Sequence, residues 1–187
     1  MSIQNKKTIE VYQKTASKYL ADSIEHESSN MEKVKAKREK LQAFLKNSFS
    51  SLPKGSKLFE IGSADGENAK YLKNLGYNVT ASDIADEFIK AIKANGLDAI
   101  IFNVLEDSFL DKYFGIFCWR VFVHFTKDDA LQVLTKTYDA LEKGGIFVFN
   151  AMNREIRQVE GEWVDFQGEF HMGIFRFYRY FNFNVMC

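Results

Sequence analysis

Short apolar runs alternate with amphipathic stretches along the middle of the chain, from Lys57 to Met152. This alternation is typical of strands and helices in a parallel sheet, because a helix carries the chain back before the next strand begins. We expect strands at residues 57–61, 78–82, 98–102, 114–119 and 146–152. Glycines stand next to several of these runs, where helices end and turns begin. The sequence therefore predicts an α/β fold with a mostly parallel, twisted sheet.

Two further parts flank this core. Helical periodicity predicts helices at residues 6–25 and 31–47, with residues 26–30 between them. After Met152, apolar and polar residues alternate in a way that is typical of strands with two different faces. A length of 187 residues suits one structural domain. We divide the chain into an N-terminal helical cap at 1–50, an α/β core at 51–152 and an aromatic-rich C-terminal hairpin or lid at 153–187.

The helix that follows His124 has a clear start. Thr126 and Asp129 have the spacing of a capping box, in which each side chain bonds the backbone N–H of the other residue. An apolar series then recurs at helical spacing, at Leu131, Leu134, Tyr138 and Leu141.

Charge and cysteine content exclude several classes of protein. Lys plus Arg and Asp plus Glu are 25 each, which argues against a nucleic-acid partner. The segment up to Lys57 nevertheless carries 12 basic and 6 acidic residues, either to steer an acidic substrate or as a solvated helix surface. Cys118 and Cys187 make no disulfide framework, and no signal peptide or membrane-spanning run is evident, so we expect a cytoplasmic protein. The three histidines lack metal-ligand spacing, so we expect no metal.

The most informative motif is LFEIGSADG at residues 58–66. A predicted strand carrying Glu60 turns through Gly62 and Gly66 into a predicted helix. Such a turn lets a ligand approach bare backbone at a helix N-terminus. The next strand brings Asp83 to the place where an acid accepts hydrogen bonds from ribose hydroxyls. Together these features predict a site for a nucleoside-containing cofactor.

The charge near this loop bears on which cofactor fits. Four acids gather there without a lysine or arginine among them: Glu60, Asp65, Glu67 and Asp83. We expect them to repel a pyrophosphate and to tolerate a cofactor with a sulfonium and an ammonium group. Ala64 also stands where the dinucleotide fingerprint requires glycine, so a dinucleotide-dependent oxidoreductase is disfavoured.

The motif resembles motif I of class I S-adenosylmethionine-dependent methyltransferases, where an acid at the strand end precedes a glycine, three residues and another glycine. The resemblance extends through most of the chain. It implies a Rossmann-like three-layer sandwich, with S-adenosyl-L-methionine as cofactor and S-adenosyl-L-homocysteine as product. It also implies that Asp83 binds the ribose and that Ile84 packs on the adenine. The cofactor residues that it implies are Glu60, Gly62, Ser63, Ala64, Gly66, Asp83, Ile84, Asn103, Val104, Leu105, Cys118, Tyr12 and Tyr19.

The resemblance implies direct in-line methyl transfer to a small-molecule acceptor, near the end of the fourth strand. His124 is the first candidate for a base there, because a neutral imidazole accepts a proton near pH 7; the alternative is a structural histidine bonded to backbone. Arg120 is a candidate for binding a substrate carboxylate or phosphate, with a surface ion pair as the alternative. The candidate substrate-binding residues are Trp119, Asn150, Trp163, His171, Arg176 and Tyr178.

The chain departs from this family after its fifth strand. Family sheets have seven strands, and the 35 residues after Met152 are too few for both a lid and the usual final hairpin. We therefore expect a β-rich extension that lacks the full final hairpin. Either this tail replaces the missing strands, or the fifth strand is left uncovered. An uncovered strand predicts pairing between chains, and hence a homodimer. Two hypotheses stay open: a small-molecule methyltransferase, and a truncated or catalytically silent protein that binds the cofactor or a protein partner without turnover.

Overall fold

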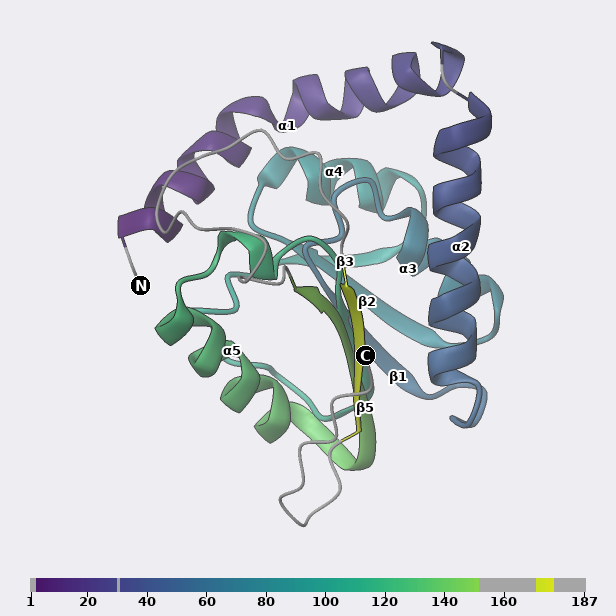
Figure 1. Ribbon diagram of the computed structural model, residues 1–187, viewed down its shortest axis with the longest axis vertical. Helices are drawn as coiled ribbons and strands as arrows, with labels where there is room; N and C mark the ends of the chain where they lie inside the picture. The colour runs from purple at the N-terminus through teal and green to yellow at the C-terminus, as the bar shows by residue number, and fades with distance from the viewer. Residues whose placement is uncertain (1–2, 30, 152–170, 177–187) are drawn as a thin grey trace.

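The computed structural model describes residues 3–29, 31–151 and 171–176. In chain order the elements are α1 (Ile3–Ser29), α2 (Met31–Phe49), β1 (Lys57–Ile61), α3 (Glu67–Asn74), β2 (Asn78–Asp83), α4 (Asp86–Ala94), β3 (Asp98–Ile101), β4 (Tyr113–Cys118), the 3-10 turn η1 (Phe122–His124), α5 (Lys127–Ala140), β5 (Leu141–Ala151) and β6 (His171–Arg176). Figure 1 shows the sheet at the centre, with helices on both of its faces and α1 across one end.

The sheet has the strand order β3-β2-β1-β4-β5-β6. Strands β1 to β5 are parallel, and β6 pairs antiparallel with β5. Ile61 is in register with Ser82 of β2 on one side and Cys118 of β4 on the other, so the carboxyl ends of these strands meet at one edge. The order reverses between β1 and β4, which is where open α/β sheets bind their ligands. The predicted three-layer α/β fold is confirmed.

Apolar side chains fill the space on both faces of the sheet. On one face, Leu45 and Phe49 of α2 pack with Ile92 of α4 and the inward side chains of the strands. On the other face, α5 covers an aromatic cluster in which Phe59 of β1 contacts Phe102. A smaller group joins α1 to α4 through Ala16, Ala85 and Phe88. The third group holds α1 over the carboxyl edge of the sheet.

Several predicted boundaries differ from the structure. Helix α1 continues through residues 26–29, because this polar stretch contains neither glycine nor proline. Strand β5 begins at Leu141 and contains Gly144, whose φ of 79° accompanies a shift in register with β4. The predicted turn at Gly144 is therefore an irregularity within the strand. No helix among the described residues is long and apolar enough to cross a membrane.

Strand β6 decides between the two expectations for the fifth strand, because the tail covers it. Its backbone pairs along β5 from Ile146 to Ala151, so β5 is an interior strand of the sheet. The specific reason for expecting a homodimer is thereby removed, and the oligomeric state itself stays a prediction. The rest of the predicted C-terminal hairpin lies outside the described residues.

Candidate functional site

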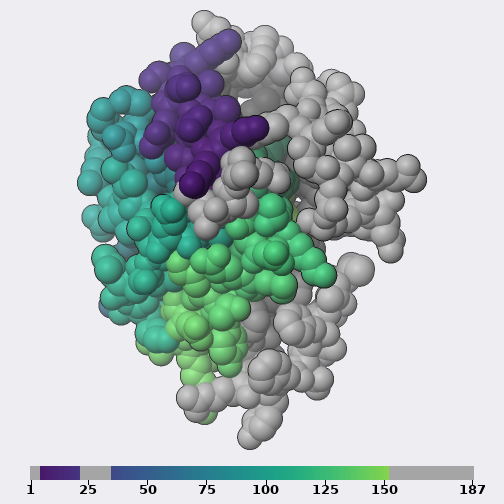
Figure 2. Space-filling view, turned by 90° about the vertical axis from the view of Figure 1, so that its left-hand side faces the viewer, coloured from purple at the N-terminus to yellow at the C-terminus, as the bar shows by residue number. Residues whose placement is uncertain are grey.

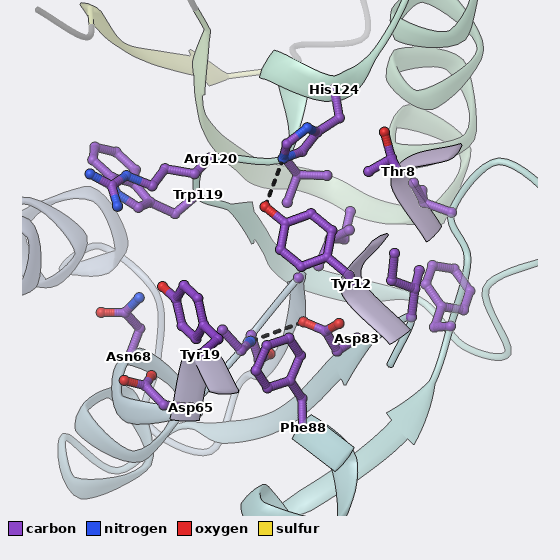
Figure 3. A pocket seen from close by; sticks show the side chains of 18 of the residues that line it. Thr8, Tyr12, Tyr19, Asp65, Asn68, Asp83, Phe88, Trp119, Arg120 and His124 are labelled. Atoms are coloured by element: carbon purple, nitrogen blue, oxygen red, sulfur yellow. Dashed lines mark hydrogen bonds between the residues drawn. The ribbon is translucent and has the colours of Figure 1, made fainter. Parts of the chain in front are cut away.

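A pocket of about 1010 Å³ opens at the carboxyl edge of the sheet. The segments that follow β1, β2, β3 and β4 form its floor, and α1 and α2 supply its other walls. Figure 3 shows side chains from α1, from the β1–α3 loop and from the segment after β4 pointing into this common space. In Figure 2 the first part of α1, drawn in purple, lies against the teal and green parts of the chain. The pocket thus occupies the position at which the strand order reverses.

The loop between β1 and α3 has a strained backbone, and its first residues line the pocket. Gly62, Ala64 and Gly66 all have positive φ angles, of 73°, 47° and 76°. Glycine adopts this region readily, whereas alanine does so at a cost. A Cβ on Gly62 would also lie 2.5 Å from Val121 Cγ2. The glycine at this position is therefore required by both conformation and space.

Hydrogen bonds tie this loop to the end of β2. The Ser63 amide donates to the Ser82 carbonyl at 2.8 Å, and the Ser82 amide donates to Ser63 Oγ at 3.0 Å. The Ser82 hydroxyl donates to the carbonyl of Glu60 at 2.6 Å. These bonds are buried, so they hold the loop in one conformation beside β2.

Asp83 completes the connection between the two strands. Its Oδ2 accepts the Ala64 amide at 3.0 Å, and its Oδ1 accepts the Ala85 amide at 3.2 Å. Burial raises the pKa of Asp83, and the backbone amides around it oppose that rise. The Ile84 amide is a third donor to this carboxylate, which has about four lone-pair sites, so capacity remains to accept a hydroxyl of a ligand. Asp83 lines the pocket with these oxygens available.

Glu60 lies behind the pocket wall, and it does not contribute the negative charge that its sequence position indicates. Its side chain is 1% exposed, and burial raises its pKa to about 8. Asn68 Nδ2 lies 3.5 Å from Glu60 Oε1, while Oε2 has no hydrogen-bond partner within the described part of the chain. At neutral pH Glu60 is therefore mainly a neutral acid.

The expectation of a purely acidic loop is wrong for a second reason. Arg38 of α2 lies 3.7 Å from Asp65 Oδ2 and 3.8 Å from Glu67 Oε2. Lys37 and Lys40 of the same helix also line the pocket. Helix α2 precedes the loop by some distance in sequence, so only the fold brings its cations to these acids. The charge argument against a pyrophosphate is accordingly weakened.

The wall near β2 and β3 suits a flat, mostly apolar group. Ile84, Phe88 and Phe102 line this part of the pocket together with Val104. Asn103 lies at the turn after β3, where its Oδ1 accepts the Leu105 amide at 3.2 Å. Figure 3 shows Phe88 beside Asp83, so an apolar face adjoins the acid.

The segment after β4 meets α1 across the pocket. The hydroxyl of Tyr12 and Nε2 of His124 are hydrogen bonded at 3.1 Å, and their rings meet edge to face. Burial lowers the pKa of His124, so its imidazole is neutral at pH 7. The pKa of Tyr12 is raised, first by burial and then by Tyr19 and Asp83, so its hydroxyl keeps its proton. This pair combines a proton donor and an acceptor at the pocket wall.

The structure brings twelve of the candidate site residues to this one pocket: Tyr12, Tyr19, Gly62, Ser63, Ala64, Asp83, Ile84, Asn103, Val104, Trp119, Arg120 and His124. Five others lie outside its lining: Glu60, Gly66, Leu105, Cys118 and Asn150. Cys118 is 1% exposed, and burial raises the pKa of its thiol. Asn150 is fully buried. Trp163 and Tyr178 lie outside the described residues, and His171 and Arg176 are described only as backbone of β6.

The sequence of this same region matches a known family. Residues 59–149 match the family model described as "Methyltransferase domain". They extend from β1 to β5 and contain the whole floor of the pocket. Residues 59–149, just under half of the chain, thus resemble a class I methyltransferase domain.

Solved structures share the fold of this methyltransferase domain. The N-methyltransferase NodS from Bradyrhizobium japonicum WM9, in complex with S-adenosyl-L-homocysteine, has a TM-score of 0.54 at 22% identity. The CcbJ methyltransferase from Streptomyces caelestis has a TM-score of 0.54 at 19% identity. A protein from Galdieria sulphuraria, named as a putative sarcosine dimethylglycine methyltransferase, has a TM-score of 0.52 at 19% identity.

These matches cover only part of each protein. They span 60%, 64% and 60% of this chain, and 60%, 51% and 44% of the NodS, CcbJ and Galdieria chains. The chain therefore matches less than two thirds of the length of these structures. No curated protein matches the sequence significantly. The matches support S-adenosylmethionine as the cofactor of the methyltransferase domain.

Several residues at the methyltransferase pocket escaped the sequence analysis. Asn5 and Thr8 of α1, Arg38 of α2 and Phe88 of α4 all line it. Phe88 is 1% exposed and stands on the apolar side of α4, so its own pattern indicates only a core residue. No sequence motif links α1 or α2 to the loops of the sheet, and only the packing of these helices shows the contacts. No cluster of three potential metal ligands occurs among the described residues.

Proposed function

We propose that this chain transfers a methyl group from S-adenosylmethionine to a small-molecule acceptor. The observation that carries the proposal is the hydrogen bond between the Ala64 amide and Asp83 Oδ2, at 3.0 Å. It joins the glycine-containing loop to the acid of the next strand, inside a pocket that also reaches the end of β4. A ligand in this pocket therefore meets the residues of this loop, an acid and an apolar wall together.

The residues present fit the parts of S-adenosylmethionine. Asp83 keeps capacity to accept a ribose hydroxyl beside its backbone donors. Ile84, Phe88 and Val104 form an apolar surface of the kind that an adenine ring packs against. The loop at residues 62–64 and the tyrosines of α1 line the rest of the pocket, where the methionine part would lie. Asp65 and Glu67 supply acidic groups close to a cationic cofactor, although Arg38 offsets part of their charge.

The bound cofactor supplies an electrophilic methyl: the acceptor's lone pair forms the new bond to carbon, and the C–S electron pair stays on sulfur as the neutral thioether. The chain's own contribution is to align the acceptor and to exclude water. For an acceptor that loses a proton, the Tyr12 hydroxyl takes that proton while giving its own to His124 Nε2. The lowered pKa of His124 keeps Nε2 available as an acceptor at neutral pH.

The small-molecule nature of the acceptor rests on the enclosure of the pocket. Helix α1 crosses the carboxyl edge, with Tyr12 reaching His124 on the far side. A polymer chain would have to displace this helix to reach the end of β4. One of the similar structures is named as a putative sarcosine dimethylglycine methyltransferase, which agrees with a small acceptor.

Calorimetric titration of the purified chain with S-adenosylmethionine, S-adenosylhomocysteine and NAD tests the cofactor assignment. We expect micromolar binding of the first two ligands and much weaker binding of NAD. Absence of binding by both sulfur ligands, or equal binding of NAD, would contradict the proposal. Formation of S-adenosylhomocysteine with a panel of amines, phenols and thiols then tests turnover. Binding without turnover of any acceptor would favour the catalytically silent alternative.

Asp83→Asn is the sharpest variant for the same titration. We expect the affinity for S-adenosylhomocysteine to fall about 10- to 100-fold, because the ribose hydroxyls lose a charged acceptor worth about 1.5–3 kcal/mol. The exposed Asp86 at the start of α4 provides the matched control, and Asp86→Asn should bind as the unaltered chain does. An unchanged affinity in Asp83→Asn would show that this acid does not hold the ribose.

A further inference from the structure

Arg120 has a backbone conformation that arginine rarely adopts. Its φ is 62°, in the left-handed region, and it directly follows Trp119 at the end of β4. Glycine takes this conformation without strain, whereas an arginine there pays a steric cost. Strain of this kind persists where the surrounding structure holds it, and it concentrates at functional sites.

Asn150 of β5 holds this conformation in place. Its Oδ1 accepts the backbone amide of Arg120 at 2.6 Å. The Asn150 side chain is fully buried and stands in a strand whose preceding residues, Phe147 to Phe149, are apolar. Its Nδ2 has no hydrogen-bond partner within the described part of the chain. Burying an amide group with an unpaired Nδ2 is unfavourable. Because its Oδ1 accepts the Arg120 amide, we infer that Asn150 shapes the turn after β4.

The turn places the Arg120 side chain at the pocket. Figure 3 shows Arg120 and Trp119 together on one side of the pocket, with Asp83 and Phe88 on another. The charge of Arg120 also acts on Tyr12, whose pKa it lowers against the larger effect of burial. Arg120 therefore faces the same space as the Tyr12–His124 pair, where the acceptor would lie.

The other charged groups of the pocket are distributed differently. Arg38 lies against Asp65 and Glu67 on the loop side, Lys37 and Lys40 line the pocket from the same helix α2, and backbone amides donate to Asp83. The pocket's volume of about 1010 Å³ is at the upper end of the roughly 300–1,000 Å³ found for a single drug-sized ligand. Space is therefore available for an acceptor beside the cofactor, on the side where Arg120 and Trp119 lie.

We propose that the acceptor carries an anionic oxygen group, a carboxylate or a phosphate, which the guanidinium of Arg120 binds beside the Trp119 indole. Asn150 is then a positioning residue, which acts by holding the left-handed turn of Arg120. This inference rests on the proposed methyltransferase function and narrows its substrate class. Guanidinium groups suit this task because their N–H donors match the oxygens of both anions.

The test uses the full chain saturated with S-adenosylhomocysteine and titrated by calorimetry with benzoate, phenyl phosphate and benzamide. We expect at least one anion to bind 10-fold or more tightly than neutral benzamide. Preference for benzoate assigns a carboxylate, and preference for phenyl phosphate assigns a phosphate. Benzamide binding as tightly as both anions would overturn the inference. Failure of S-adenosylhomocysteine itself to bind would instead overturn the proposed function, so the two failures are distinguishable.

Variants separate the roles of the two residues. Arg120→Gly keeps the left-handed turn without strain, and it should abolish the preference for anions while the chain stays folded. Asn150→Ala should reduce that preference, and Asn150→Asp, which keeps an oxygen for the Arg120 amide, should restore it. Lys90→Met removes an exposed cation outside the pocket and serves as the control. A full anion preference in Arg120→Gly would overturn the inference even where Asn150→Ala fails to fold.

Discussion

Glu60 illustrates how burial changes the chemistry of a residue in this site. Its position at the end of β1 indicates an ionised acid beside a ligand, whereas its side chain is 1% exposed and its pKa is raised to about 8. The side chains of Ser63 and Asn68 both favour its charged form, and the Asn68 contact is long, at 3.5 Å. Desolvation therefore outweighs the hydrogen bonds that would favour the charged form.

The raised pKa makes stability depend on pH in a defined direction. Between the ordinary value of 4.5 and about 8, the folded protein holds a proton on Glu60 that the unfolded chain has lost. The contribution of Glu60 to stability is therefore fully present below pH 4.5 and lost as pH rises through about 8. We expect Glu60→Gln to flatten the fall in the free energy of unfolding between pH 5 and pH 8, measured by urea titration without ligand.

The control for this measurement is Glu87→Gln, because Glu87 is only partly buried and forms its ion pair with the exposed Lys90. Its profile should follow that of the unaltered chain. A Glu60→Gln profile parallel to both would mean that Glu60 is ionised in the folded protein.

Helix α1 is fastened over the pocket by few contacts. Ala16 packs against Ala85 and Phe88 of the α4 region, and Tyr12 bonds His124. We expect Tyr12→Phe to speed hydrogen exchange in the middle of α1 roughly 2- to 10-fold, because one hydrogen bond is worth about 0.5–1.5 kcal/mol. Tyr19→Phe keeps the ring contact of Tyr19 with Phe88 and should leave the exchange rates unchanged. Equal rates in the two variants would mean that the Tyr12–His124 bond does not hold the helix.

Helix α5 begins at the capping box that its sequence predicts. Thr126 Oγ1 accepts the Asp129 amide at 3.2 Å, and Asp129 Oδ2 accepts the Thr126 amide at 3.4 Å. Thr126→Ala should lower the free energy of unfolding by about 1 kcal/mol in urea titration. Thr135→Ala is the matched control, because Thr135 is exposed and its hydroxyl bonds only the Leu131 carbonyl of its own helix in the contacts described. Equal losses in both variants would argue against a stabilising cap.

Only part of the apolar series of α5 packs against the sheet, where Leu134 and Leu141 join the aromatic cluster. Leu131 is 54% exposed and Tyr138 is 43% exposed, while Val133, Thr137 and Ala140 are buried. These three side chains are smaller than leucine or tyrosine. They allow the helix to approach a sheet face that is already filled by the phenylalanines of β1 and β5. Which face of α5 is buried thus depends on the volume of the side chains on the sheet that it covers.

The whole molecule should become more stable when the pocket is filled, because a ligand that binds only the folded state adds its binding free energy. S-adenosylhomocysteine at 100 times its Kd contributes about 2.7 kcal/mol. For a chain of this size, that corresponds to a rise in Tm of about 5–10 °C in a thermal denaturation experiment. NAD at the same concentration is the control and should produce little change. A Tm that is the same with and without saturating S-adenosylhomocysteine would contradict binding to the folded protein.

Local features were predictable from the sequence because short-range spacing specifies them. The bounds of β1, the left-handed glycines at positions 62 and 66, the position of Asp83 and the cap at Thr126 all depend on residues within a few positions of one another. Turn chemistry and strand alternation act over that range, so they fixed the parallel sheet and its cofactor loop.

The remaining features depend on contacts between segments far apart in the chain. Tyr12 and His124 are 112 residues apart, and Arg38 reaches the β1–α3 loop only because α2 packs beside α3. Glu60 retains its proton because burial removes its side chain from water. Asn150 accepts a hydrogen bond from Arg120 because β5 pairs beside β4. Burial and long-range register belong to the packed molecule, and no local spacing encodes them. The sequence thus sufficed for the fold and the cofactor loop, whereas tertiary packing settled the charge and enclosure of the pocket.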